Sequence, residues 1–480
     1  MPDPTPRSFD TSPSGAPGPR HMPPWRRLAS LTILATALVG ALACQPQEDA
    51  VSPTPTPAPD FDPVARQYVE LVLALGQHDD GYVDAFYGPE ELRQAAEAAA
   101  RTLDQIGTEA DTLIAGLGEP VEGDEMIELR RRYLKRQLEA LRSRVDQLAG
   151  VEMTFDEESK ALYDAVAPHH DDATFQATLD TLDGVLAEAG HTEGTLAERI
   201  AAFKSEFVIP SDQLDTVFQT AIAACRERTA QWLELPEGES FTVEYVNDKP
   251  WSGYNWYQGN YQSLIQVNTD LPIYIDRAID LACHEGYPGH HLYNALLEKN
   301  LTRDRGWVEL SVYPLFSPQS LIAEGSANYG IEMAFPGDER IAYEKEALFP
   351  LAGIDPERAE VYYRVLESLK GLSYAGNEAA RRYLDGELDA DQAADWLTQY
   401  AASERARSEQ RVRFFDAYRS YVINYNLGQD LVRAWVEREA GDEPEARWQL
   451  FGKLLSSPLL PSDLVTDEVA VAPDTAETEG

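Results

Sequence analysis

The chain has 480 residues, of which 82 are acidic and 40 are basic, so its formal net charge is −42. This excess of negative charge argues against nucleic acid and anionic lipid as partners of the folded part. The 43% hydrophobic share is ordinary for a globular protein, and about 400 residues without a Pro-rich break predict one large domain or two lobes that share a core.

The first 44 residues predict an export signal. Arg26 and Arg27 precede an apolar run from Leu28 to Ala43, and Cys44 follows at the expected cleavage point. This order is typical of a bacterial lipoprotein signal peptide that starts at Met22 and is lipidated at Cys44. About 16 apolar residues are too few for a membrane span. We therefore expect an extracytoplasmic protein that meets the membrane through an N-terminal lipid anchor, with plain secretion as the alternative.

The segments on either side of the folded part are expected to be extended or unstructured. Residues 45–61 contain four prolines at alternate positions, which is typical of a polyproline-like tether. Residues 466–480 are acidic and predict a disordered tail. The folded domain is therefore expected at 62–465. It contains Cys225 and Cys283, for which buried thiols are the default prediction, while a disulfide between them stays open.

Apolar spacing with a helical period predicts helices on both sides of residue 236. The expected helical stretches before it are 62–77, 90–117, 134–148, 155–166, 172–189, 196–207 and 209–232. Those in the last third are 341–351, 356–384, 390–401 and 404–439. Between them, alternating apolar residues predict strands at 241–246 and 263–268, separated by an aromatic stretch. The fold is thus expected to be mainly α, with a small antiparallel β insertion.

Directly after the insertion, His284 is followed by a glutamate and by two more histidines, His290 and His291. In zinc hydrolases with this pattern, two neutral imidazoles bind Zn²⁺ and the glutamate is the general base. On an unbroken helix His284 and His290 would lie about 240° apart around the axis and about 9 Å apart along it. Pro288 cannot continue a helix, so we predict a break at Tyr287–Pro288 that returns His290 toward His284. His291 is the alternative ligand.

A third ligand is expected from the segment 317–329. Ser317 can cap a helix with Pro318 at its first position, which places Glu324 in the second turn of a small and apolar stretch. A carboxylate in such surroundings needs a partner, and a metal ion is a suitable one. We therefore predict that His284, His290 and Glu324 hold Zn²⁺ and that Glu285 takes a proton from the attacking water. His291 is expected to support the site by hydrogen bonding.

These residues also carry a family resemblance. The run His284-Glu-Gly-Tyr-Pro-Gly-His-His-Leu292 and the later Glu324-Gly-Ser-Ala-Asn-Tyr329 resemble a large bacterial family, known as a domain of unknown function, with an H-E-x-x-P-G-H-H motif and a later E-G-W-A-x-Y. That family is similar to Taq-type carboxypeptidases and angiotensin-converting enzyme, which are all-helical zinc peptidases. Ser326 stands where the family usually has Trp.

The resemblance implies a fold of two helical lobes around a deep cleft with zinc at its floor. It also favours His290 over His291, because Gly289-His-His-Leu-Tyr293 resembles the Gly-His-Ala-Leu-Tyr that closes the Taq-type motif. In such peptidases the strand before the motif helix is an edge strand that binds peptide by β-augmentation.

The same role is thereby implied for the strand residues Leu264, Gln266 and Asn268, although a sheet that only covers the helical core is an equal alternative. Peptide hydrolysis also needs a hydrogen-bond donor for the oxyanion. Tyr425-Asn-Leu-Gly428 resembles a Tyr-x-x-Gly of the family's C-terminal helix, so Tyr425 is the first candidate donor and Tyr421 the second.

Two arginines of the same region, Arg433 and Arg419, are candidates for binding a substrate carboxylate. For each candidate Tyr or Arg the alternative is a structural role. The predicted function is zinc-dependent hydrolysis of a peptide or small amide, in the manner of a carboxypeptidase or an oligopeptidase. The alternatives are a zinc hydrolase of a non-peptide amide or ester and a surface-binding lipoprotein without catalysis. The oligomeric state is not predicted.

Overall fold

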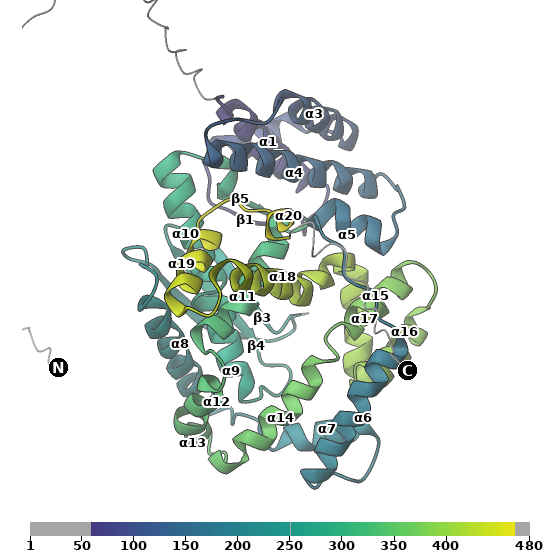
Figure 1. Ribbon diagram of the computed structural model, residues 1–480. Helices are drawn as coiled ribbons and strands as arrows, with labels where there is room; N and C mark the ends of the chain where they lie inside the picture. Colours follow the sequence, from purple (N-terminus) through teal and green to yellow (C-terminus); the bar gives the residue numbers. More distant parts are fainter. Residues whose placement is uncertain (1–58, 250, 466–480) are drawn as a thin grey trace, which may run out of the picture. The chain divides into compact units, whose positions relative to one another are not determined.

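The computed structural model describes residues 59–249 and 251–465, and this part of the chain is mainly helical (Figure 1). The mainly α prediction is confirmed. The signal peptide with Cys44, most of the tether and the tail at 466–480 lie outside the described residues. The described residues belong to one compact unit, and the cleft between two lobes stays a prediction. Within these residues no helix combines the length and the apolar character that crossing a membrane requires.

The helices before the β insertion begin largely at side-chain caps. Thr102, Thr154 and Thr195 each accept a hydrogen bond from the backbone N–H three residues later. The stretch 90–117 forms two helices, because Ala100 adopts a left-handed conformation (φ 43°) and Thr102 starts a new helix. These helices are α1 (Asp62–Leu75), α2 (Glu90–Ala99), α3 (Leu103–Gly116), α4 (Glu125–Leu148), α5 (Phe155–Tyr163), α6 (Asp172–Glu188), α7 (Leu196–Ser205) and α8 (Leu214–Ala230).

The helices after the insertion are more broken than the sequence predicts. The stretch 404–439 is divided at Arg419, which has a positive φ of 51°, and 356–384 is divided by a turn after Lys370. The longer helices are α9 (Asp276–Leu281), α10 (His290–Leu297), α11 (Pro318–Ala334), α14 (Ala359–Lys370), α15 (Ala375–Leu384), α16 (Ala390–Tyr400), α17 (Arg405–Tyr418), α18 (Ile423–Ala440) and α19 (Pro444–Leu455). The shorter ones are η1 (Ala282–Gly286), η2 (Glu298–Arg303), η3 (Val308–Ser311), α12 (Glu339–Tyr343), η4 (Glu344–Leu348), α13 (Phe349–Leu351), η5 (Pro356–Arg358), η6 (Arg419–Val422) and α20 (Pro461–Leu464).

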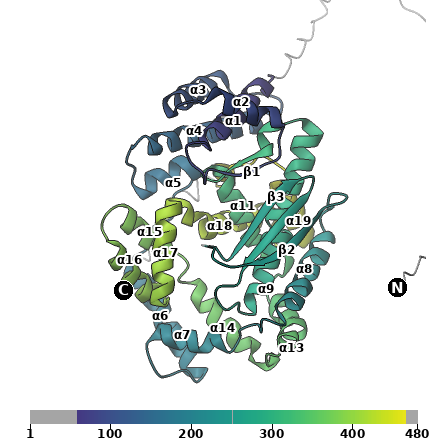
Figure 2. The same ribbon diagram turned by 180° about the vertical axis from the view of Figure 1, so that it is seen from behind.

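The β insertion is a three-stranded sheet, which Figure 2 brings to the front. Its strands are β2 (Ser240–Val246), β3 (Gly253–Gly259) and β4 (Gln262–Asn268), in the order β2-β4-β3. Both predicted strands are present, and the aromatic stretch between them forms β3. The sheet is mixed rather than purely antiparallel, because β3 turns back into β4 through Asn260 and Tyr261 and so leaves β4 parallel to β2. A second small sheet pairs β1 (Val83–Phe86) with β5 (Val312–Pro314).

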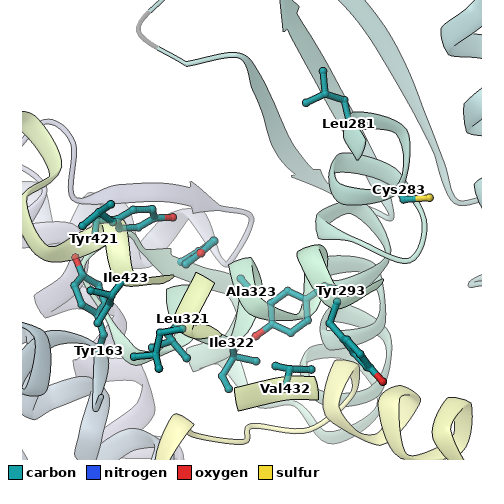
Figure 3. Close-up of a cluster of buried hydrophobic side chains, with 14 of the residues drawn as sticks. Tyr163, Leu281, Cys283, Tyr293, Leu321, Ile322, Ala323, Tyr421, Ile423 and Val432 are labelled. Atoms are coloured by element: carbon teal, nitrogen blue, oxygen red, sulfur yellow. The ribbon is translucent and has the colours of Figure 1, made fainter. Parts of the chain in front are cut away.

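Helices α11 and α18 pack against each other through two glycines. A Cβ atom on Gly325 would lie 2.4 Å from the backbone of Gly428, and one on Gly428 would lie 2.7 Å from the carbonyl oxygen of Leu321. Neither position therefore has room for a side chain. Figure 3 shows Leu321 and Ile322 of α11 together with Ile423 and Val432 of α18 in one buried cluster. Because Glu324 directly precedes Gly325, this close approach brings Glu324 next to the start of α18 and to Tyr421 just before it.

Cys225 and Cys283 form a disulfide, with their Cα atoms 5.5 Å apart. The default prediction of two buried thiols is therefore wrong, and the pairing that the sequence left open is present. Cys225 lies in α8 and Cys283 in η1, directly before His284. The bond thus ties the segment with the histidine motif to a long helix outside it.

Candidate metal centre

The helix that carries the motif is broken as predicted. It continues from α9 into η1, which ends at Gly286, and Tyr287 is extended (φ −127°, ψ 120°). The Tyr287–Pro288 peptide is cis, and α10 begins anew at His290. Gly289 is required here, because a Cβ atom would lie 1.8 Å from the carbonyl oxygen of His284.

The break brings three predicted ligands to one point. The Nε2 atoms of His284 and His290 are 3.1 Å apart, and Oε2 of Glu324 lies 3.3 Å from the first and 3.6 Å from the second. Tetrahedral ligands about 2.0–2.1 Å from one Zn²⁺ are separated by about 3.3–3.4 Å. The expected approach of the two histidines to within about 4 Å is therefore confirmed. The residues present fit a zinc ion, and of the described residues only these three form such a group.

Hydrogen bonds orient these ligands. Asn328 donates from Nδ2 to the carbonyl of Tyr425 (2.9 Å), which leaves its Oδ1 to accept from Nδ1 of His284 (2.9 Å). The Nε2 lone pair of His284 then faces Glu324 and His290, which is the tautomer that a metal needs. The hydroxyl of Tyr421 donates to Oε1 of Glu324 (2.8 Å). The other carboxylate oxygen of Glu324, Oε2, points toward the two imidazoles.

The charges in the cluster are strongly coupled. Burial raises the pKa of Glu324, but the imidazoles of His284 and His290 outweigh burial and hold that pKa well below its usual range. Burial lowers the pKa of His290, but Glu324, Glu285 and Asp84 together raise it to about 9. The cluster therefore favours an ionised carboxylate and a positive charge beside it. A divalent cation supplies this charge in place of a proton.

Glu285, the predicted general base, is 4% exposed and lies beside β3. A Cβ atom on Gly253 of β3 would come within 2.8 Å of its Oε1, so the glycine leaves room for the carboxylate. Asn255 of the same strand donates a hydrogen bond to the Glu285 carbonyl oxygen (2.7 Å). Strand β3 therefore positions both the backbone and the side chain of Glu285.

His291 points away from the cluster and is fully buried. Its Nε2 lies 3.0 Å from Oε2 of Glu239, which as a carboxylate can only accept, so Nδ1 accepts from the Ser263 hydroxyl (2.9 Å). Tyr287 and Arg226 also donate to Glu239. Burial raises the pKa of Glu239, but these three donors lower it below the usual value. His291 thus fastens the start of α10 to the sheet and supports the site through the backbone.

The two candidate tyrosines have different partners. The Tyr421 hydroxyl is bonded to Glu324, so Tyr421 orients a ligand and its role as an oxyanion donor is not supported. The hydroxyl of Tyr425 has no hydrogen-bond partner within 59–249 and 251–465. Burial raises the pKa of Tyr425 well above its usual value, and Glu324 and Glu285 raise it further. Tyr425 therefore keeps its proton and lies close enough to Glu324 and Glu285 for their charges to act on it.

The two candidate arginines are already paired. Arg433 donates to Glu332 (2.6 Å) and to Asp430 (3.0 Å). Arg419 donates to the buried Glu158 (2.6 Å), which also accepts from the backbone N–H and the hydroxyl of Ser420. Neither guanidinium can bind a substrate carboxylate without losing these bonds, which favours the structural role that was the alternative for both. Substrate binding by either arginine stays a prediction. The Glu158 contact instead fixes the turn η6 that carries Tyr421.

The predicted substrate strand is also a structural element. Leu264, Gln266 and Asn268 lie in β4, whose two edges pair with β2 and β3. The amide of Asn268 is bonded to the carbonyls of Lys249 and Trp251. A strand with both edges occupied cannot accept a further strand, so the β-augmentation prediction is wrong for β4. The sheet edge beside Glu285 belongs to β3, which pairs with no other strand than β4 among the described residues.

Asp84, on β1, is a residue of the site that the sequence analysis missed. Its carboxylate accepts a hydrogen bond from Tyr254 of β3 (2.9 Å). Burial raises the pKa of Asp84 to about 6, although the hydrogen bond from Tyr254 opposes the shift and His290 also lowers it. Asp84 precedes His284 by 200 residues in the sequence, and no local pattern marks it. Asn328 carried a weak signal, since it is one helical turn after Glu324.

No family model matches the sequence. No curated protein matches it either. Among solved structures, the chain is similar to a "putative lipoprotein" from Colwellia psychrerythraea, with a TM-score of 0.47 and 15% identity over 78% of this chain and 71% of that one. It is also similar to a "putative lipoprotein of unknown function" from Shewanella oneidensis, with a TM-score of 0.43 and 13% identity over 78% and 74% of the two chains.

Proposed function

We propose that the protein is a zinc-dependent hydrolase of peptide bonds. The observation that carries the proposal is the separation of the ligand atoms of His284, His290 and Glu324, at 3.1, 3.3 and 3.6 Å, with Glu285 directly after the first ligand. Two imidazoles and one carboxylate leave a coordination position open, as in catalytic rather than structural zinc sites. A zinc ion held by these three residues would polarise a carbonyl group and lower the pKa of a water molecule.

The residues around the cluster fit the remaining tasks. Glu285 accepts the proton of the attacking water and returns it to the leaving amine. Tyr425 donates a hydrogen bond to the oxyanion that develops on the scissile carbonyl. The free edge of β3, next to Glu285 through Gly253, offers backbone groups to an extended peptide. This proposal assigns to β3 the role that the sequence analysis gave to β4.

We place this activity outside the cytoplasm, on a protein anchored through lipidated Cys44. The signal-peptide pattern of residues 22–44 supports this location. The Cys225–Cys283 disulfide agrees with it, since such bonds persist in oxidising compartments. Mass spectrometry of the mature N-terminus tests the anchor: an acylated Cys44 is expected, and an N-terminus without lipid would leave secretion as the alternative.

The test of the function is a digest of a random peptide library by the purified protein. Cleavage is expected to stop with a chelator and to return with Zn²⁺. A panel of non-peptide amides and esters runs in parallel, and turnover of that panel alone would make the protein a different zinc hydrolase. If the zinc-loaded protein cleaves neither set, the proposed hydrolase function fails, and a surface-binding lipoprotein without catalysis becomes the favoured hypothesis.

A further inference from the structure

Arg411, on α17, is an arginine without an acidic partner. No hydrogen bond or ion pair to it occurs within the described residues, although 82 of the chain's residues are acidic. Burial lowers its pKa below the usual value, and only Tyr425 partly offsets this effect. The side chain of Arg411 is packed among protein atoms, but the residue is only half-buried and still contacts solvent. A desolvated cation without a counter-charge destabilises a fold, so such a group indicates a role in binding.

A continuous row of aromatic rings joins Arg411 to the metal cluster. The guanidinium carbon lies 4.8 Å from the ring centre of Phe414, which is 4.6 Å from that of Tyr418. Positions 411, 414 and 418 share one face of α17. The ring of Tyr418 is 6.1 Å from that of Tyr421, whose hydroxyl donates to Glu324. The face of α17 that carries Arg411 therefore leads to the predicted zinc ligands.

Arg411 also acts on the proposed oxyanion donor. Its charge lowers the pKa of Tyr425, against the effects of burial, Glu324 and Glu285, which raise it. The guanidinium of Arg411 is therefore close enough to Tyr425 for its charge to act on the hydroxyl, as the charges of Glu324 and Glu285 do. The net charge of −42 repels an anionic substrate group from most of the surface. A cation without a carboxylate partner therefore attracts such a group to its own position.

We propose that Arg411 binds a carboxylate of the substrate and so determines which peptides are cleaved. The proposal rests on the function proposed above and assigns to Arg411 the role that the sequence predicted for Arg433 and Arg419, which are both paired with carboxylates. A guanidinium binds a carboxylate through two parallel hydrogen bonds, and Arg411 has its donors free of protein acceptors. The carboxylate is either the C-terminus of the peptide, which makes the enzyme an exopeptidase, or an acidic side chain.

The test uses three peptides of one sequence: a free acid without acidic side chains, its C-terminal amide, and an amide that contains one Glu. We expect kcat/KM to be about 10- to 100-fold higher for one carboxylate-bearing peptide than for the plain amide, the usual range for a charge-assisted hydrogen bond. Preference for the free acid identifies the C-terminus, and preference for the Glu peptide identifies a side chain. Arg411→Gln should remove the preference, and Arg413→Gln, on the exposed side of α17, should keep it.

Equilibrium binding of the same peptides to the zinc-loaded Glu285→Gln variant separates this proposal from the function. If no peptide is cleaved, the proposed function fails, and a binding preference that disappears with Arg411→Gln still supports the carboxylate site. Arg411→Lys guards against misfolding, since it keeps the charge and should retain part of the preference. Equal affinity of the parent protein for acid and amide peptides, or an unchanged preference in Arg411→Gln, would overturn the proposal.

Discussion

The motif segment, residues 282–291, and the shell around it, made of β3, β4, α17 and α18, differ in how their geometry arises. In the motif segment, Pro288 and Gly289 break the helix locally, and the ligand atoms of His284 and His290 meet within 3.1 Å. In the shell, the role of each residue depends on partners far away in sequence. Arg433 on α18 is paired with Glu332, whereas Arg411 on α17 has no acidic partner among the described residues. Local backbone chemistry thus places the predicted ligands, whereas pairing over long distances in sequence decides which side chains of the shell stay free.

The largest expected effect distinguishes the adjacent histidines of the motif segment. His290→Ala should remove most of the zinc affinity, because it deletes a ligand atom at the cluster. His291→Ala should lower that affinity about 10- to 100-fold at most, the usual cost of losing a supporting partner. Zinc titration against a competing chelator measures both constants. Equal losses in the two variants would contradict the assignment of His290 to the metal cluster and of His291 to the contact with the sheet.

Much of the motif segment was therefore predictable from sequence. The helix break, the approach of His290 and the outward turn of His291 follow from the missing N–H of Pro288 and from the backbone freedom of Gly289. The cluster with Glu324 required only that a buried carboxylate needs a partner. The predicted helices are present for the same reason, since apolar periodicity is a local property.

The shell could not be predicted in this way. Leu264 to Asn268 has the alternation of an edge strand, but β3 and β2 occupy both of its edges. Arg419 and Arg433 look available in the sequence, and Glu158 and Glu332 bind them from 261 and 101 residues away. The disulfide of Cys225 likewise spans 58 residues. Pairings at such distances leave no periodic signal in the chain.

The next effect concerns Glu285 alone. Glu285→Gln should keep the zinc and the fold and should lower turnover about 100-fold or more, since it removes the general base without changing the shape of the side chain. Turnover of the cleaved library peptide and zinc content are measured together. Loss of zinc in this variant would make Glu285 a ligand and would change the assignment of the motif segment.

A pair of tyrosine variants sharpens the comparison within the shell. Tyr425→Phe should lower kcat about 100-fold with unchanged zinc affinity, because it removes a donor to the oxyanion. Tyr421→Phe should instead weaken zinc binding about 10-fold, because its hydroxyl orients Glu324. Steady-state kinetics and zinc titration are recorded for both. The opposite assignment of the two effects would return Tyr421 to the role of oxyanion donor.

The smallest predicted effect is on β3, where the two regions meet. Gly253→Ala places a methyl group 2.8 Å from Oε1 of Glu285, so the carboxylate must move, and kcat should fall about 10-fold while zinc stays bound. Gly184→Ala is the control, because its added Cβ meets no atom within 4 Å. Equal kcat values for the two variants would show that β3 does not position the base.

The account depends most on the cluster of His284, His290 and Glu324, and the zinc content of the purified protein tests it most directly. Elemental analysis of the purified protein should give about one zinc per chain, because two imidazoles and a carboxylate suit Zn²⁺ better than Mg²⁺ or Ca²⁺. His284→Ala purified in the same way should give close to none. A protein without transition metal that gains none when zinc is supplied, and that His284→Ala leaves unchanged, would contradict the account.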